Sequence, residues 1–170
     1  MDFEISHSFE TDAETLSSVM LDEEYQRSLD DIGALKERQL LSQRKEADGL
    51  VRRRVRCVLD INLSGAAKRL LGDSDPAWIE EATWHPKESR WEWIIHPEVA
   101  KELLDAKGTI RVHDSDGGTN RTVAGKVKVK VPVYGGRVEG WIVEGIEHAY
   151  DEEATRLAAW LDTDRRPLQT

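Results

Sequence analysis

The chain has 170 residues, the length of a single domain that can bury a substantial apolar core. Its formal net charge of -9 disfavours nonspecific nucleic-acid binding, and no apolar run approaches the roughly 20 residues that a membrane span needs. The N-terminus lacks the basic and apolar regions of a signal peptide, and a single cysteine, Cys57, excludes an intrachain disulfide, so we expect a cytoplasmic protein.

The first third of the chain predicts one strand followed by two short helices. Residues 3–9 alternate, which indicates a strand with one buried face formed by Phe3, Ile5, His7 and Phe9. Thr11 has the capping-box spacing to Glu14, so we expect it to cap a helix whose inward residues are Leu16, Val19 and Met20. Asp22 is expected to cap a second short helix, which Gly33 ends.

The middle of the chain changes to a period of two residues. Residues 35–44 and 50–59 predict a hairpin, and in its second strand one face is apolar while the other carries Arg52, Arg54 and Arg56. Ser64 can cap a short helix that Gly72 closes. Residues 78–84 and 90–95 predict a further hairpin, in which Trp91, Trp93 and Ile95 share a face.

Two more strands are expected before the C-terminal helix. Residues 97–107 are ambiguous and allow a short helix; residues 109–113 and 119–131 predict strands joined by a tight turn. The last strand alternates valines with Lys126, Lys128 and Lys130, and Gly125 on its apolar face suggests a bulge or bend. Connections of hairpin length make the sheet antiparallel.

Residues 132–161 predict one long amphipathic helix. Its apolar stripe consists of Val138, Trp141, Ile142, Gly145, Ile146 and Ala149, and resumes at Leu157, Trp160 and Leu161. Charged residues at 151–156 interrupt the stripe, so we expect residues 138–149 to cover any ligand pocket and residues 157–161 to anchor the helix. We expect one domain over residues 1–163 and a flexible tail over 164–170.

This order of elements resembles the START-like or SRPBCC superfamily. The resemblance is carried by a first strand with Phe3 and Ile5, by the helix start at residues 11–14, by Asp22 and Tyr25, and by the long C-terminal helix. More narrowly, the passage from Val129 to Glu139 and the closing Ala159-Trp160-Leu161 look like one bacterial family of unknown function within the superfamily. The resemblance implies the α+β helix-grip fold: a curved seven-stranded antiparallel sheet wrapped around a long C-terminal helix, with two short helices between strands 1 and 2. The extra helix at 64–71 is not part of that plan.

The resemblance further implies a cavity between sheet and helix, although close packing of the helix on the sheet is the alternative. We expect the cavity to bind a hydrophobic small molecule or lipid, as a carrier or sensor, without transforming it. The residues expected to line it are Arg53, Val55, Trp91, Trp93, Ile95, Val127, Val129, Trp141, Ile142 and Gly145. Catalysis of the cyclase, dehydratase or hydrolase kind is the second hypothesis, for which His7, Arg53 and Glu37 are the available acid-base set.

Arg53 shares a face with Val51 and Val55, and a buried arginine is costly unless it is paired. We favour an Arg53 that reaches solvent at the strand end; if it lies inside, it would hold a carboxylate of a ligand or of Glu37. The outer stripe of arginines and lysines is interpreted as a solvated face, with an acidic partner, an anionic membrane surface or the acidic N-terminal third of a second copy of the chain as the alternatives. The five histidines lack metal-ligand spacing, there is no phosphate loop or nucleophile elbow, and no cofactor is expected. We interpret Cys57 as a buried structural thiol.

Overall fold

A computed structural model of the chain describes residues 1–33, 35–59, 76–99 and 101–164. In this part of the chain, seven strands form one sheet in the order β1-β7-β6-β5-β4-β3-β2, and every neighbouring pair is antiparallel. The elements are β1 (Asp2–Phe9), α1 (Ala13–Leu21), α2 (Glu23–Ser28), β2 (Leu35–Lys45), β3 (Val51–Leu59), β4 (Ala77–His85), β5 (Arg90–Pro97), β6 (Leu104–Ser115), β7 (Gly118–Val129) and α4 (Gly135–Asp164).

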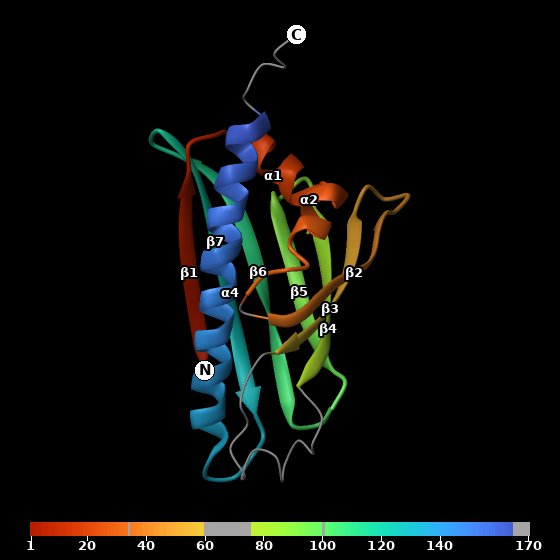
Figure 1. Ribbon diagram of the computed structural model, residues 1–170, viewed down its shortest axis with the longest axis vertical. Coiled ribbons are helices and arrows are strands. Elements are labelled where there is room, and N and C mark those ends of the chain that lie inside the picture. The colour runs from red at the N-terminus through yellow and green to blue at the C-terminus, as the bar shows by residue number, and fades with distance from the viewer. Residues whose placement is uncertain (34, 60–75, 100, 165–170) are drawn as a thin grey trace.

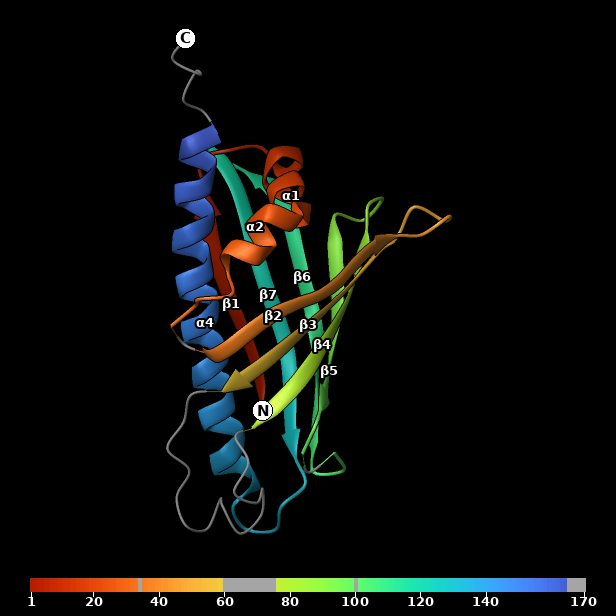
Figure 2. The same ribbon diagram turned by 45° about the vertical axis from the view of Figure 1, so that its right-hand side comes forward.

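The sheet bends around the long C-terminal helix. Figure 1 shows α4 running along the sheet in front of β1 and β7, with α1 and α2 beside its C-terminal end. In Figure 2 the strands β2 and β3 run obliquely, with one end of each directed toward α4, which shows the curvature of the sheet. The expected α+β helix-grip architecture is therefore confirmed, with its two short helices between β1 and β2. The helix predicted at 64–71 lies outside the described residues.

The structure corrects the cap expected for α1 and decides residues 97–107, which the sequence left ambiguous. The N-cap of α1 is Asp12, not Thr11, because the Asp12 carboxylate accepts hydrogen bonds from both the backbone N–H and the hydroxyl of Thr15, at 2.7 and 2.9 Å. No helix forms in the described part of 97–107: β5 continues to Pro97, and β6 begins at Leu104. The alternating inward residues of β6 extend back to Ala106, which pairs with Val127, and this ladder outweighs the local helix signals.

Gly125 does not mark a bulge, because β7 pairs in continuous register with both of its neighbours. Instead, Trp93, Gly108, Gly125 and Phe3 follow one another across four adjacent strands. A Cβ atom on Gly125 would lie 2.5 Å from Cζ2 of Trp93, so the glycine leaves space for the indole ring. The ring reaches Phe3, with 6.2 Å between ring centroids. This row fixes Trp93 against the inner face of the sheet.

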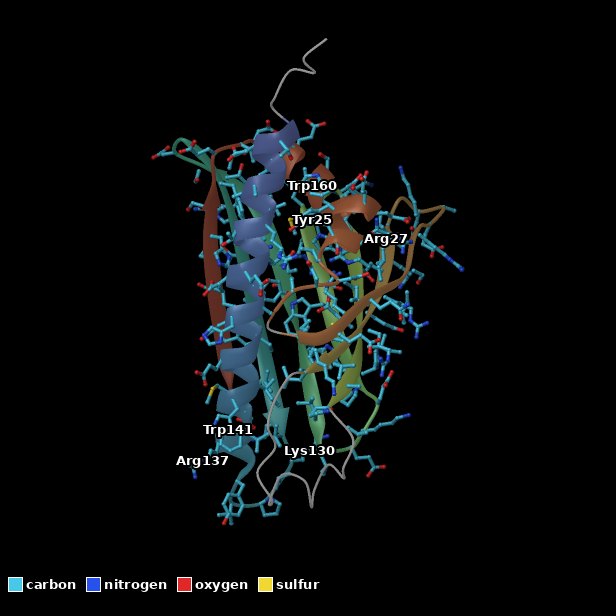
Figure 3. The ribbon with its side chains drawn as sticks, in the orientation of Figure 1. Tyr25, Arg27, Lys130, Arg137, Trp141 and Trp160 are labelled. Carbon is cyan, nitrogen blue, oxygen red and sulfur yellow. The ribbon has the colours of Figure 1, made fainter. Side chains whose placement is uncertain are left out.

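The C-terminal half of α4 anchors the helix. Leu157 is fully buried, and Ala154 and Leu161 are nearly so. The edge of Trp160 meets Tyr25 of α2 at 5.4 Å between ring centroids, and Figure 3 shows the two side chains at the same end of the molecule. The charged segment interrupts the stripe only in part: Ala154 within it is buried, whereas Glu153 lines the cavity.

Candidate ligand cavity

A cavity of about 170 Å³ lies between the inner face of the sheet and α4. The strands β2 to β6 form its wall, α4 lies opposite, and α1 and α2 contribute Met20 and Gln26 at one end. Most of the lining is apolar and includes Trp78, Trp93, Ile95, Leu104, Ile142 and Ile146. The expected hollow is therefore present. It lies over five of the seven described strands, since no residue of β1 or β7 lines it.

Six of the ten residues predicted to line a cavity do so: Arg53, Val55, Trp93, Ile95, Ile142 and Gly145. Trp91, Val127 and Val129 are buried but not at the cavity, because Trp91 lies against Arg53 and β7 packs directly against α4. Trp141 is 51% exposed. Its indole lies beside the guanidinium of Arg137, 5.8 Å from ring centroid to carbon, and Figure 3 shows both residues at the N-terminal end of α4. Val143 takes the buried position instead.

Arg53 is buried, with 6% of its surface exposed, so the expectation that it reaches solvent is wrong. Its Nη1 donates to the carbonyl of Met20 at 3.0 Å, in the last turn of α1, where unpaired carbonyls and the helix dipole favour a cation. Its guanidinium lies 4.3 Å from the centre of the Trp91 ring. Burial lowers the pKa of Arg53. Glu37 is not its partner, because Glu37 accepts a hydrogen bond from Arg56 on the outer face.

Glu80 is a polar cavity residue that was not predicted from the sequence. It lies opposite Val55 in the β3–β4 ladder and lines the cavity. Burial raises the pKa of Glu80; the positive charges of Arg53 and Arg38 partly offset this, and the negative charge of Glu153 adds to it. The structure gives its carboxylate no hydrogen bond or ion pair with any described residue. The signal was present in the sequence, since Glu80 alternates with Trp78, Ala82 and Trp84 on one apolar face.

Glu153 also lines the cavity and belongs to a buried network behind it. Arg121 has no exposed surface, and its Nη1 lies 3.3 Å from Oε1 of Glu153. Its Nη2 donates to the carbonyl of Tyr150 at 3.1 Å and faces Nδ1 of His7 at 3.3 Å. His7 in turn hydrogen-bonds Asp151 at 2.8 Å. His7 therefore links β1 to α4 outside the cavity, and the proposed set of His7, Arg53 and Glu37 is not brought together.

Two further residues at the cavity are held neutral. Burial raises the pKa of Tyr150 well above its ordinary value, and the charges of Glu80 and Glu153 add to this. Burial also raises the pKa of the Cys57 thiol to about 12, which agrees with a structural cysteine. Within residues 1–33, 35–59, 76–99 and 101–164, no group of three or more His, Cys, Asp or Glu residues is arranged to hold a metal ion. No helix in those ranges is long and apolar enough to cross a membrane.

Solved structures share this fold at low sequence identity. The Zhui aromatase/cyclase from Streptomyces sp. R1128 is similar at a TM-score of 0.67 and 11% identity, covering 99% of this chain and 98% of that chain. The TTHA0849 protein from Thermus thermophilus has a TM-score of 0.66 and 16% identity, with 94% and 98% covered. A START superfamily protein from Mycobacterium smegmatis has a TM-score of 0.60 and 17% identity, with 94% and 98% covered.

These similarities show that the chain shares the helix-grip fold of these structures, one of which is a START superfamily protein. Among curated protein sequences no significant match was found. The sequence profile of one family matches residues 4–161, nearly the full length of the chain, and that family is described as protein of unknown function DUF2505. The chain therefore belongs to the DUF2505 family.

Proposed function

We propose that this protein binds a hydrophobic small molecule or lipid between the sheet and α4, as a carrier or sensor that does not transform it. The observation that carries the proposal is the apolar cavity of about 170 Å³. Protein interiors are normally close-packed, so a hollow of this size within the core calls for an occupant. An engineered apolar cavity of about 150 Å³ is known to take up benzene, so this one has room for a group of at least that size.

Gly145 allows the proposal to be tested by filling the cavity. It lines the cavity from α4, and a Cβ atom there would meet only Cδ1 of Leu59, at 3.8 Å. A Gly145→Leu side chain would therefore grow into the hollow. Gly140→Leu is the matched control, because Gly140 is on the same helix but not at the cavity, and both changes remove a poor helix former.

The measurement is an NMR titration with propylbenzene. We expect the wild-type protein and Gly140→Leu to bind it alike, with shifts in the amide signals of β3, β4 and α4. Gly145→Leu should bind at least tenfold more weakly while its circular dichroism stays unchanged. Equal binding by Gly145→Leu, or no binding by the wild-type protein, would count against the proposal. Native mass spectrometry of protein from its own host should reveal a co-purified small molecule.

Glu80 supports a second candidate function, acid-base catalysis in the same cavity. A cavity carboxyl group whose pKa is raised by burial is a candidate general acid or base, and Arg53 can stabilise an anion that forms beside it. Cyclisation or dehydration of a polyketide-like substrate is the reaction class, because the similar Zhui protein is an aromatase/cyclase. This places the candidate acid on β4, not on the strand that carries His7.

Turnover of β-ketoacyl thioester mimics, followed by mass spectrometry, would test the catalytic candidate. Glu80→Gln keeps the size of the side chain and removes its proton exchange, so it should abolish turnover. Glu81→Gln is the matched control, since Glu81 is exposed on the outer face and pairs with Arg54. If Glu80→Gln retained full turnover of a converted substrate, the assignment of Glu80 would be wrong.

A further inference from the structure

We infer that the natural ligand is an uncharged molecule with a hydroxyl group at one end, which it places between Glu80 and Arg53. This inference rests on the proposed binding function and names the ligand class that the cavity would take. Three observations support it. Arg53 and Glu80 carry charges without an ion-pair partner, both have hydrogen-bonding atoms without a partner among the described residues, and the rest of the cavity lining is mainly apolar.

The described positive and negative side chains near Arg53 are equal in number. Arg121 pairs with Glu153 at 3.3 Å, and Arg38 pairs with Asp30 at 3.4 Å. Arg53 and Glu80 are left, one charge of each sign, and no ion pair within 4 Å joins them in the described part of the chain. A ligand carboxylate would therefore lie beside the carboxylates of Glu80 and Glu153, and a ligand ammonium would lie beside buried guanidinium groups. Both arrangements bury like charges together, which is costly.

The hydrogen-bonding capacity of the two residues is also unfilled. Arg53 uses Nη1 for Met20, its Nε has no partner, and no described residue accepts a hydrogen bond from Nη2. Glu80 offers carboxylate oxygens with no donor. A hydroxyl group is the smallest group that both donates and accepts, so it can donate to Glu80 and accept from Arg53 at once. Hydrogen bonds that involve a charged group contribute more than neutral ones, which gives the pair a strong preference for such an end group.

The rest of the ligand must be apolar and compact. Away from Arg53 and Glu80, the lining consists mainly of aromatic and aliphatic side chains, among them Trp78, Leu104, Ile142 and Ile146. The volume of about 170 Å³ suits a ring with a short alkyl substituent. A phenol with a short chain has these properties.

Four matched probes test the inference by isothermal titration calorimetry: propylbenzene, 4-propylphenol, 4-propylbenzoate and 4-propylbenzylamine. The wild-type protein should bind the phenol at least tenfold more tightly than each of the others. Glu80→Gln leaves Arg53 unopposed, so the benzoate should gain at least tenfold while the phenol weakens. Arg53→Gln should favour the benzylamine in the same way, and the outer-face control Glu81→Gln should leave all four affinities unchanged.

A double variant keeps the test decisive if a single change unfolds the protein. Arg53→Met/Glu80→Leu removes both charges, and replacing a buried charged pair by apolar groups is often tolerated. It should bind propylbenzene at least as well as the wild-type protein and lose the preference for the phenol. If the wild-type protein bound propylbenzene and the phenol equally, or bound the benzoate most tightly, the hydroxyl inference would be overturned and cavity binding would stand. If no probe bound to either protein, both proposals would fail.

Discussion

At the scale of single residues, Gly125 provides the space that Trp93 occupies. A Cβ atom there would lie within 3 Å of three ring atoms, two of Trp93 and one of Phe3. Overpacking of this kind forces side chains from their preferred rotamers, so we expect Gly125→Ala to destabilise the protein by about 1–3 kcal/mol. Urea unfolding followed by tryptophan fluorescence would measure the loss. No change in the unfolding midpoint would contradict this account of the glycine.

The same clash predicts a rescue. Trp93→Leu removes the ring atoms that Gly125→Ala would meet, so the two substitutions together should cost less than the sum of their separate effects. Gly136→Ala is the control, because a Cβ atom at that position would meet no heavy atom within 4 Å. We expect it to be neutral or slightly stabilising. Strict additivity of Gly125→Ala and Trp93→Leu would show that the two residues do not compete for space.

Glu139 makes stability depend on acid pH. Its carboxylate accepts a hydrogen bond from the backbone N–H of Val129 at 2.9 Å and pairs with the N-terminal ammonium of Met1 at 2.9 Å. These contacts lower the pKa of Glu139 from 4.5 to about 2. Because the folded-state pKa lies below the unfolded value, the stabilisation is present above about pH 4.5 and is lost as the pH falls toward about 2.

Unfolding by urea at a series of pH values would test the role of Glu139. We expect Glu139→Gln to be less stable than the wild-type protein at pH 7, and the difference to shrink steadily between about pH 4.5 and pH 2. Glu144→Gln is a matched control on the exposed side of the same helix. A difference between Glu139→Gln and the wild-type protein that stayed constant across this range would show that the charge of Glu139 is not what stabilises the fold.

At the scale of elements, the two halves of α4 have different roles. Leu157 is fully buried in the anchoring half, so Leu157→Ala should cost about 2–5 kcal/mol. Ile142 lines the cavity, so Ile142→Ala enlarges an existing hollow and should cost less, while weakening ligand binding. Trp141→Ala should change stability by about 0.5 kcal/mol or less, because the indole is half exposed. Chemical denaturation would rank the three variants by their free energy of unfolding. If Trp141→Ala destabilised the protein as much as Leu157→Ala, this division of the helix would be wrong.

The basic stripe on the outer face of the sheet has acidic partners on neighbouring segments. Arg54 pairs with Glu81 at 3.0 Å, and Arg56 pairs with Glu37 at 3.0 Å and with Glu98 at 2.9 Å. These exposed pairs contribute little to stability, but they neutralise much of the charge on that face. The interpretation as a solvated sheet face therefore needs no partner protein. Binding through this face, or a homodimer, stays a prediction that charge reversal at Arg52, Arg54 and Arg56 would test.

The sequence predicted the elements better than the site, for a physical reason. Strand alternation and helix periodicity are local, so the hairpins and α4 could be located to within a few residues. The exposure of Trp141 could not be predicted. Val138, Ile142 and Val143 are compatible with two rotations of the helix about its axis, and only one of them buries Trp141. The burial of Arg53 depends on the end of α1, which supplies its carbonyl acceptor from Met20, and no spacing rule encodes that contact.

At the scale of the whole molecule, the sheet is divided between strands that pack against α4 and strands that line the cavity. The strands β1 and β7 pack directly against α4, which is why Val127 and Val129 are buried without reaching the cavity. The strands β2 to β6 line the hollow. The charged end of that hollow joins Arg53 of β3, Glu80 of β4 and Glu153 of α4, which are far apart in sequence. Only the folded chain brings these charges together, so the sequence alone predicted a cavity but not its chemistry.

This division predicts an uneven response to ligand. A ligand that binds only the folded state stabilises it by about 2.7 kcal/mol at one hundred times its dissociation constant, and local openings at the binding site are suppressed further. Under saturating 4-propylphenol, hydrogen exchange should slow most in β3, β4 and residues 142–153 of α4. The strand β1 has no residue at the cavity and serves as the internal control, and Gly145→Leu should abolish the effect. Protection of β1 equal to that of β3 and β4 would mean that the ligand acts through global stability alone, not at the cavity described.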